Sequence, residues 1–354
     1  MQSEELAERI FMSTLGAAEM VSVHLCEQLG VYQFLHDHGP ATEADVAKAC
    51  GIAQRYAREF LEQQAVAGFL TTDDADLPAE ERRYELPREH VPVLIDKDHV
   101  LHAAPFPRLF TAAALQVPAL LEAYRTGGGV PWSAYGEWMR TAQAEANRPL
   151  FLGPLGTEML PTLSDVHQRL TDGGTVADIG CGDGWSSIGI ARAYPQTRVD
   201  GYDVDAASID AARRNAKEYG VDDRVTFALV DGASVQTDKR YDLVTFFECV
   251  HDMPDPVSVL AGARRIVADE GTVLVMDEKV GEKFTVPCDE IERMMYAYSF
   301  LVCLPDGMSH PDSAGTGTVM RPATLEKYAT EAGYTGLDVL PIEHDFFRFY
   351  RLQH

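Results

Sequence analysis

The sequence predicts an α/β protein in two parts: a mainly α-helical winged-helix domain, then an open, mostly parallel β-sheet with helices on its faces. Two observations predict it. From Thr175 onward, strand patterns alternate with helix patterns, as in βαβ units. Before residue 100, two short helical patterns precede two short strand patterns, as in a helix-turn-helix with a wing. A chain of 354 residues accommodates two domains, and we place the boundaries at 1–99, a helical connector at 100–168, and 169–354.

The N-terminal region begins with a helical pattern over residues 4–37, which Gly30 interrupts. Thr42 is a good N-cap for a short helix that ends at Gly51. A second helix is predicted over residues 54–67. Its expected inward-facing residues are Tyr56, Phe60, Leu61 and Val66.

Two short strands, 69–72 and 83–86, complete a winged helix-turn-helix, which raises the question of DNA binding. The charges oppose it, because residues 1–100 hold 19 acidic and 8 basic residues. The whole chain has a net charge of -25, which repels phosphate backbones and anionic membrane surfaces. We therefore expect a dimerisation or substrate-covering domain, with neither nucleic acid nor membrane as partner.

The connector over residues 100–168 contains the glycine run 127–129, followed closely by aromatic residues. These are Trp132, Tyr135 and Trp138. Two interpretations stay open: the aromatic side chains form core packing between domains, or they belong to a hinged lid over a ligand.

The C-terminal half has five predicted strands in series, then a final hairpin after an insertion of about 55 residues. The helix patterns between the strands include 207–219 and 256–267. The expected strands are 175–179, 198–203, 225–230, 241–247 and 272–277, with a hairpin over 336–340 and 345–352.

A glycine-rich turn, DIGCGDG at 178–184, directly follows the first of these strands. Gly180 and Gly182 leave room for a ligand against the backbone, and the helix that starts near Trp185 points its N–H groups at the same space. A dinucleotide-binding fingerprint requires a third glycine where Trp185 stands. The acidic Asp178 two positions before Gly180 also favours a nucleoside with an amino-acid tail over one with a pyrophosphate.

Two further aspartates follow the next two strands. Asp203 lies about twenty residues beyond the glycine turn, where a carboxylate can accept from both ribose hydroxyls. Asp205 is the expected cap of the following helix. Asp231, directly after the third strand, can accept from an adenine amino group. Because ligands of open α/β sheets bind at the carboxyl ends of the strands, the three aspartates together predict a nucleoside site.

The D-x-G-x-G-x-G turn, Asp203, Asp231 and the YDLV strand resemble class I methyltransferases that use S-adenosyl-L-methionine (SAM). The resemblance covers about residues 150–354, and the whole layout is similar to small-molecule O-methyltransferases with an N-terminal winged-helix dimerisation domain. It implies a Rossmann-like, seven-stranded sheet in the order 3-2-1-4-5-7-6, with the seventh strand antiparallel. It also implies SAM as cofactor, S-adenosyl-L-homocysteine (SAH) as product, and a homodimer through the N-terminal helices.

The resemblance also implies the residues that hold the cofactor, and no metal is expected among the site residues. The implied cofactor-binding set is Asp178, Gly180, Cys181, Gly182, Asp203, Val204, Asp231, Gly232 and Phe247.

A histidine follows the fourth strand, in the segment ECVHDMPD at 248–255. The resemblance makes His251 the general base that removes a hydroxyl proton, and imidazole titrates near neutrality. Asp277 aligns with the carboxylate that orients this histidine, and Glu278 is the neighbouring alternative. The other interpretation is that His251 only shapes its loop, since methyl transfer to amines or carbon needs little more than orientation. Asp242 is expected to be structural.

The insertion at 281–320 is expected to roof the substrate, and its aromatic and methionine side chains suit a flat or apolar small molecule. Core packing explains the same residues equally well. They are Met294, Met295, Tyr296, Tyr298 and Phe300, opposite a polar helix face with Glu290, Glu292 and Arg293.

The remaining composition indicates a cytoplasmic protein. Six cysteines show no C-x-x-C spacing, and the N-terminus has no signal-peptide pattern. The predicted function is transfer of a methyl group from SAM to a small organic molecule, and the resemblance implies oxygen as the acceptor atom. Two alternatives stay open: a SAM-responsive winged-helix transcriptional regulator, and a SAM-binding enzyme with other chemistry.

Overall fold

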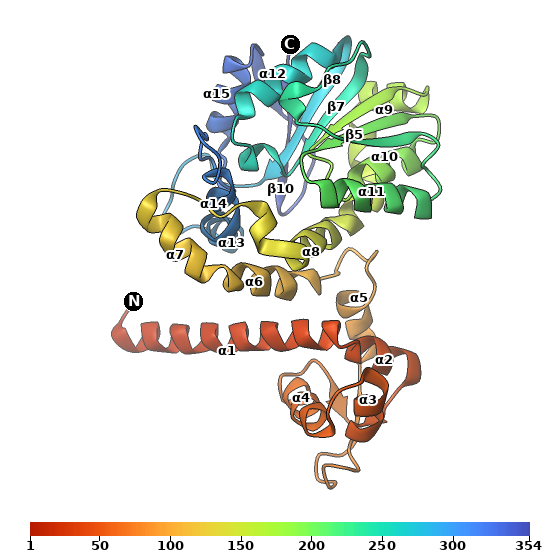
Figure 1. Cartoon of the computed structure of the whole chain (residues 1–354), viewed down its shortest axis with the longest axis vertical. Coiled ribbons are helices and arrows are strands. Elements are labelled where there is room, and N and C mark those ends of the chain that lie inside the picture. Colours follow the sequence, from red (N-terminus) through yellow and green to blue (C-terminus); the bar gives the residue numbers. More distant parts are fainter. The chain divides into compact units, whose positions relative to one another are not determined.

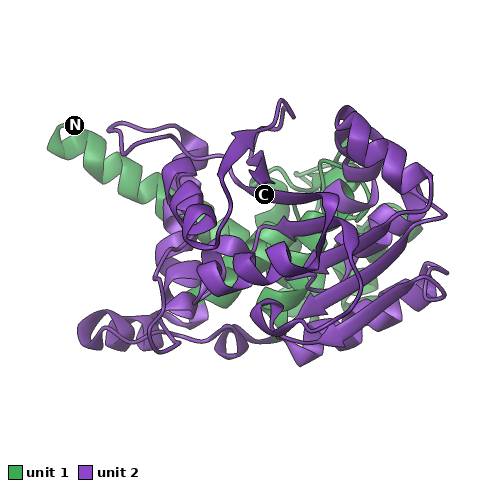
Figure 2. Cartoon of the chain, turned by 90° about the horizontal axis from the view of Figure 1, so that it is seen from above, with its two compact units in different colours: residues 1–114, 137–149 green, residues 115–136, 150–354 purple.

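The computed structural model describes all residues, 1–354, and divides into two compact units. Unit 1 comprises residues 1–114 and 137–149, and unit 2 comprises residues 115–136 and 150–354 (Figure 2). Residues of the predicted connector belong to both units. None of the helices is long and apolar enough to span a lipid bilayer.

Unit 1 contains a winged-helix fold (Figure 1). Its β1, β3 and β2 form a three-stranded sheet in that order. Thr42 forms a capping box at the start of α3, and Gly51 ends that helix with a positive φ of 67°, as predicted. The elements are α1 (Ser3–Gln28), α2 (Val31–His38), β1 (Ala41–Thr42), α3 (Glu43–Cys50), α4 (Gln54–Val66), β2 (Thr71–Thr72), β3 (Arg83–Glu85), α5 (Val91–Leu94) and α6 (Pro105–Leu115).

The prediction for the inner face of α4 is wrong at two positions. Tyr56 is 76% exposed and Val66 is 87% exposed, whereas Leu61 is fully buried. The polar Gln64 takes an inward position instead and accepts a hydrogen bond from the hydroxyl of Tyr32 at 2.5 Å. A buried amide with partners is satisfied, so hydrophobicity alone did not identify the buried face.

Unit 2 is built on a seven-stranded sheet in the order β6-β5-β4-β7-β8-β10-β9. Strand β10 is antiparallel to both β8 and β9, and the other pairs are parallel. This confirms the predicted order 3-2-1-4-5-7-6. The strands are β4 (Thr175–Ile179), β5 (Arg198–Asp203), β6 (Val225–Leu229), β7 (Tyr241–Phe247), β8 (Val267–Glu278), β9 (Gly336–Val339) and β10 (Phe347–Gln353).

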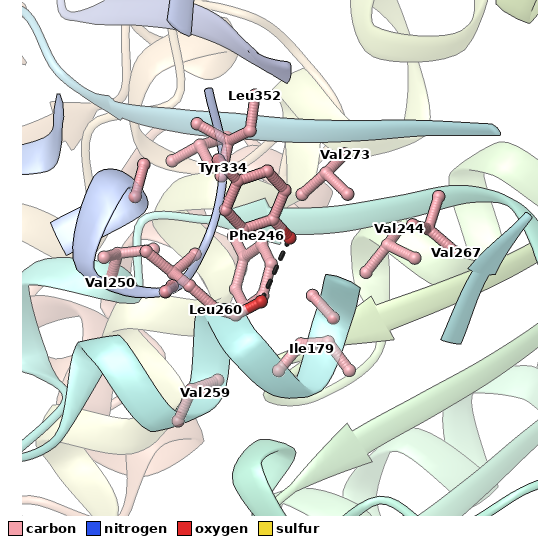
Figure 3. Close-up of a cluster of buried hydrophobic side chains, with 14 of the residues drawn as sticks. Ile179, Val244, Phe246, Val250, Val259, Leu260, Val267, Val273, Tyr334 and Leu352 are labelled. Carbon is pink, nitrogen blue, oxygen red and sulfur yellow. Dashed lines mark hydrogen bonds between the residues drawn. The ribbon is translucent and has the colours of Figure 1, made fainter. Parts of the chain in front are cut away.

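Helices cover both faces of this sheet (Figure 1). A core of aliphatic and aromatic side chains lies between the sheet and helices α12 and α15 (Figure 3). In it the Tyr334 hydroxyl donates to the Leu260 carbonyl at 3.0 Å, so the buried phenol is satisfied. The helices of unit 2 are α7 (Val117–Thr126), α9 (Ser164–Thr171), α10 (Trp185–Ala193), α11 (Ala206–Glu218), α12 (Pro256–Ile266), α13 (Glu290–Tyr298), α14 (Leu304–Gly307) and α15 (Pro322–Glu331), and α8 (Trp132–Leu152) is shared with unit 1.

Candidate active site

The glycine turn leaves the carboxyl end of β4, the central strand of the parallel series. Gly180, Gly182 and Gly184 have φ angles of 73°, 51° and 83°, a region that other residues rarely adopt. A Cβ at Gly180 would lie 2.8 Å from both Cβ and Sγ of Cys249, so packing within the protein already requires a glycine there. A Cβ at Gly182 would meet nothing within 4 Å, and open space at that backbone suits a ligand.

Asp178 holds the start of the glycine turn in place through hydrogen bonds. Its carboxylate accepts hydrogen bonds from Ser186 and Ser187 of α10 at 2.6 Å each, and from Thr245 of β7 at 2.8 Å. Only 1% of the residue is exposed, and burial raises the pKa of its carboxyl. The side chain therefore ties β4, β7 and the start of α10 together, while its predicted contact with the cofactor stays a prediction.

Asp203 joins the end of β5 to the glycine turn. Its Oδ2 accepts from the Gly182 N–H at 2.8 Å, and its Oδ1 accepts from the Asp205 N–H at 2.8 Å. Burial raises the pKa of this carboxyl. Asp205 caps α11 by accepting from the Ser208 N–H at 2.9 Å, as predicted. Val204 is 72% exposed beside them.

Asp231 lies at the end of β6 and is exposed. It accepts from the Ala233 N–H at 2.8 Å and opens a short 3-10 turn. Gly232 is constrained by packing, because a Cβ there would lie 2.6 Å from Ile179 Cγ2 and 2.8 Å from Val259 Cγ1. Strands β6, β5 and β4 are neighbours in the sheet, so the fold brings Asp231, Asp203 and the glycine turn to one edge.

Cys181 and Phe247 flank this edge as buried side chains. Burial raises the pKa of the Cys181 thiol well above its usual range. Phe247, at the end of β7, packs on Phe151 with ring centroids 5.5 Å apart. Both residues contribute apolar surface at the place where the sequence predicts a nucleoside.

His251 follows β7 in a 3-10 turn, Val250–Asp252, and is 3% exposed. Its Nδ1 lies 2.8 Å from Asp277 Oδ1 and 3.1 Å from Glu278 Oε2, at the end of the neighbouring strand β8. Its Nε2 lies 3.3 Å from Asp252 Oδ1. The structure thus brings the two predicted catalytic residues together, and both sequence candidates at the end of β8 contact the ring.

We call His251, Asp252, Asp277, Glu278 and Cys303 the His251 pocket. Burial opposes the charged imidazole, but the carboxylates of Asp252, Asp277 and Glu278 outweigh it and raise the pKa of His251 well above 6.5. Burial raises the pKa of Glu278 to about 7, with Asp277 adding to the effect and His251 opposing it. The three carboxyl groups therefore favour the protonated form of His251, and lowering the negative charge around the ring favours the neutral form.

Cys303 and Asp306 are site neighbours that the sequence did not suggest. The donor atoms of His251, Asp252 and Cys303 lie within 4.8 Å of one another. Burial, with a contribution from Asp252, raises the pKa of Asp306 to about 6. Both residues come from the insertion at 281–320, whose turns place them only after folding, and no motif surrounds them.

The insertion and part of the connector pack together within unit 2. The Val130 N–H donates to the Pro305 carbonyl at 2.9 Å, and the Trp132 N–H donates to Asp306 Oδ1 at 2.7 Å. The Tyr135 hydroxyl donates to the Leu301 carbonyl at 2.6 Å. A Cβ at Gly129 would lie 2.2 Å from the Pro305 carbonyl oxygen, which explains the last residue of the glycine run.

One residue of the predicted polar face of α13 is buried. Glu292 is 3% exposed and accepts from Arg321 at 2.8 Å and from the Gly281 N–H at 2.9 Å. The polar face of α13 is therefore partly buried, because a buried carboxylate is stable when it is paired and hydrogen-bonded. These bonds tie the start of the insertion to the start of α15.

Two family models match the chain. Residues 170–312 match the methyltransferase domain, and residues 17–95 match the Rv2258c-like winged HTH domain. Among curated relatives, the chain is 32% identical over 127 residues to the 27-O-demethylrifamycin SV methyltransferase of Amycolatopsis mediterranei, which is 33% of this chain and 46% of that protein. It is 35% identical over 99 residues to the ubiquinone biosynthesis O-methyltransferase of Serratia proteamaculans, 28% of this chain and 40% of that protein. The chain thus spans less than half the length of these two relatives.

Solved structures share the fold over the whole chain. The mitomycin 7-O-methyltransferase MmcR superposes with a TM-score of 0.71 and 19% identity, covering 99% of this chain and 98% of that one. The structure of PigF with SAH superposes with a TM-score of 0.72 and 16% sequence identity, covering 100% of both chains. The structure of human N-acetylserotonin methyltransferase with SAM superposes with a TM-score of 0.70 and 16% sequence identity, covering 100% of this chain and 99% of that one. The chain thus contains a methyltransferase domain and an Rv2258c-like winged HTH domain, and it shares its overall fold with these solved methyltransferase structures.

Proposed function

We propose that this protein transfers a methyl group from SAM to a small organic molecule, with an oxygen as the acceptor atom. The observation that carries the proposal is the convergence of Asp203, Asp231 and the open backbone at Gly182 on one sheet edge. The methyltransferase domain match, and the O-methyltransferases among the relatives, support the reaction and the acceptor atom.

The residues of this edge fit SAM. Asp203 would accept from the ribose hydroxyls, Asp231 from the adenine amino group, and the Gly182 backbone has the space that an amino-acid tail needs. When bound, SAM supplies a methyl group on a positively charged sulfonium and leaves as SAH. The other residues proposed for cofactor binding are Asp178, Gly180, Cys181, Val204, Gly232 and Phe247.

His251 is the proposed proton acceptor, with Asp277 as the residue that holds its ring. Asp277 accepts the hydrogen on Nδ1 at 2.8 Å, which leaves Nε2 for the proton of an acceptor hydroxyl. Because the pocket raises the pKa of His251, the neutral base forms only as pH increases or as positive charge enters the pocket. This dependence on charge gives the proposed role a measurable pH signature.

The winged-helix domain is proposed to serve dimerisation rather than DNA binding. The two arginines of α4 are already paired, Arg55 with Glu59 and Arg58 with Glu43. They offer no basic face for phosphates. This observation favours the enzyme over a SAM-responsive regulator.

A second copy of the chain is the proposed occupant of an apolar groove between α1 and α4. The groove has a volume of about 500 Å³ and is lined by Val21, Leu25, Tyr56 and Phe60 among others. Residues 3–15 of α1 are all exposed, and an isolated helix of that length is marginal in water. Burial against a partner copy would stabilise both features.

The dimer is tested by sedimentation of two variants of α4. Tyr56→Asp places a charge in the groove and is expected to give a monomer at micromolar concentration. Val66→Asp changes a residue of similar exposure, 87% against 76%, that does not line the groove, and is expected to leave the dimer intact. A wild-type monomer, or equal effects of both changes, would contradict the proposal.

The cell compartment is proposed to be the cytoplasm. The six cysteines are all unpaired, which suits a reducing compartment.

The function is tested by transfer of labelled methyl from SAM into a host-cell extract, beside an Asp203→Ala control. We expect label in a small molecule and its loss in the variant. Label in protein or RNA would contradict the substrate class. SAM binding without any transfer would favour an enzyme with other chemistry.

A further inference from the structure

Residues 115–136 belong to unit 2, although the chain on both sides of them belongs to unit 1. This segment contains α7, the glycine run 127–129 and the start of α8. Gly127 ends α7 with a positive φ of 76°. Gly136 has a φ of 76° and a ψ of -168°, a backbone conformation that is essentially restricted to glycine. The short stretch between these two glycines therefore has a residue at each end where the backbone can change direction.

The residues between the two glycines dock on a part of the insertion. We call residues 129–135 the clasp and residues 299–309 the roof segment. Three hydrogen bonds of 2.6 to 2.9 Å join them, and their donors are Val130, Trp132 and Tyr135. A Cβ at Gly129 would also lie 2.2 Å from the Ser309 nitrogen, so the two backbones touch at that point. The clasp is therefore held at a few specific points, most of them on the main chain.

The roof segment continues into a stretch that is bonded to the loop of His251. The Gly317 N–H donates to the His251 carbonyl at 3.2 Å, and the Ala314 N–H donates to the Pro254 carbonyl at 2.8 Å. The roof segment itself contains Cys303, whose sulfur lies within 4.8 Å of a ring nitrogen of His251. This part of the insertion is therefore joined to the clasp at one end and to the His251 loop at the other.

The helix that precedes the clasp buries few of its side chains. Leu120 and Ala123 of α7 are buried, whereas Leu121 and Tyr124 are 53% and 60% exposed. The Tyr124 hydroxyl donates to the Phe300 carbonyl of the roof segment at 3.0 Å. Segments with few buried apolar contacts open at a lower free-energy cost than the core of a protein. The clasp and α7 are therefore suited to local opening.

His251 is 3% exposed, so an acceptor hydroxyl can reach its ring only after some of the surrounding residues move. We infer that the clasp holds the roof segment closed over His251 and releases it to admit the methyl acceptor. The role for the acceptor rests on the proposed function, whereas the docking of the clasp does not. The partner of the clasp lies 166 residues or more further along the chain, so no local sequence pattern identifies it.

The docking of the clasp is tested by hydrogen–deuterium exchange of the full-length protein without SAM or acceptor, measured by mass spectrometry of peptides. The main-chain N–H groups of Val130 and Trp132 are bonded to the roof segment, so their exchange reports release of the clasp. Gly129→Ala adds a Cβ that overlaps the backbone of the roof segment. It should speed exchange in the clasp and in the roof segment at least about fivefold.

Gly128→Ala is the matched control for this variant. Neither glycine has a positive φ, and a Cβ at Gly128 would meet only Thr126 Oγ1, at 3.5 Å. Exchange in the clasp should therefore stay within about twofold of the wild type. Thermal melting of each variant shows whether it is folded at the temperature of the exchange experiment.

A second pair of variants removes one hydroxyl from each of two buried tyrosines, which are 4% and 3% exposed. Tyr135→Phe loses the hydrogen bond to the Leu301 carbonyl and should speed exchange at Val130 by about two- to tenfold. Tyr334→Phe loses a hydrogen bond to the Leu260 carbonyl in the core beside α12, and it should leave exchange in the clasp unchanged.

Equal exchange in Gly129→Ala and Gly128→Ala, or no protection of Val130 and Trp132 in the wild type, would overturn the inference. Equal rates of methyl transfer by the two glycine variants, with exchange as expected, would contradict the role of the clasp in admitting the acceptor. Failure of the wild type to transfer methyl, with exchange as expected, would contradict the proposed function alone.

Discussion

The two halves of the candidate site satisfy their carboxylates in different ways. At the ends of β4 to β6, Asp178, Asp203 and Asp231 accept hydrogen bonds from hydroxyls or main-chain N–H groups. In the His251 pocket, Asp277 and Glu278 each have a buried oxygen without a partner. The first half is therefore preformed at the place where we propose that SAM binds. In the second half, three carboxyl groups surround one imidazole, which makes its chemistry sensitive to pH.

Replacement of His251 should break the second half and leave the first intact. His251→Ala is expected to reduce kcat by about 10²- to 10⁴-fold, the range for loss of a general base. SAH affinity should stay within about twofold, because the ring is not part of the proposed nucleoside site. Single-turnover methyl transfer and SAH calorimetry measure the two effects. Unchanged kcat would show that His251 only shapes its loop.

Two glycines of the turn have different surroundings: Gly180 packs against Cys249, whereas Gly182 faces open space where we propose that a ligand binds. Gly180→Ala places a Cβ on a backbone with a positive φ, and this Cβ would overlap with Cys249. The substitution should therefore lower the free energy of unfolding by about 2–4 kcal/mol. Gly182→Ala meets open space and should cost only about 1 kcal/mol of backbone strain. Denaturant unfolding without ligand measures both. Equal losses would contradict the difference in surroundings.

The charge of the pocket should be visible in the pH dependence of kcat. Since the pKa of His251 is raised, the neutral base and therefore kcat should increase through a pH range above 6.5. Asp252→Asn removes one of the three carboxylates that raise this pKa, so the rise should move to lower pH. Asp255→Asn keeps the N-cap of α12 and should leave the profile unchanged. A shift with both variants, or with neither, would argue against this origin.

The fold was predictable where local pattern and topology agree. Strands β4, β5 and β7 have the predicted bounds. Strands β4 and β7 are buried along most of their length, as parallel strands are, whereas β5 reads RVDGYD and was delimited by the turns around it. The order of the sheet came from the resemblance, since pairing across the chain has no local signal. The inner face of α4 was mispredicted at Tyr56 and Val66, where exposed apolar side chains follow the same spacing as buried ones.

The site residues that directly follow a strand were predictable from the sequence. Asp203 and Asp231 were placed at strand ends by sequence, and parallel order then brings them together. Cys303, Asp306 and the buried Glu292 depend on how the insertion packs, which no periodicity encodes. The excess charge around His251 likewise appears only when residues 251–252 and 277–278 meet.

The central claim, that the edge of β4 to β6 holds SAM, is tested most directly by calorimetric titration of SAH into three proteins. These are the wild type, Asp203→Ala, and Asp205→Ser, which retains the cap of α11. The account predicts one SAH per chain for the wild type and for Asp205→Ser, and at least about 30-fold weaker binding for Asp203→Ala, from the loss of charged hydrogen bonds. Equal affinity of all three proteins, or no binding to the wild type, would contradict it.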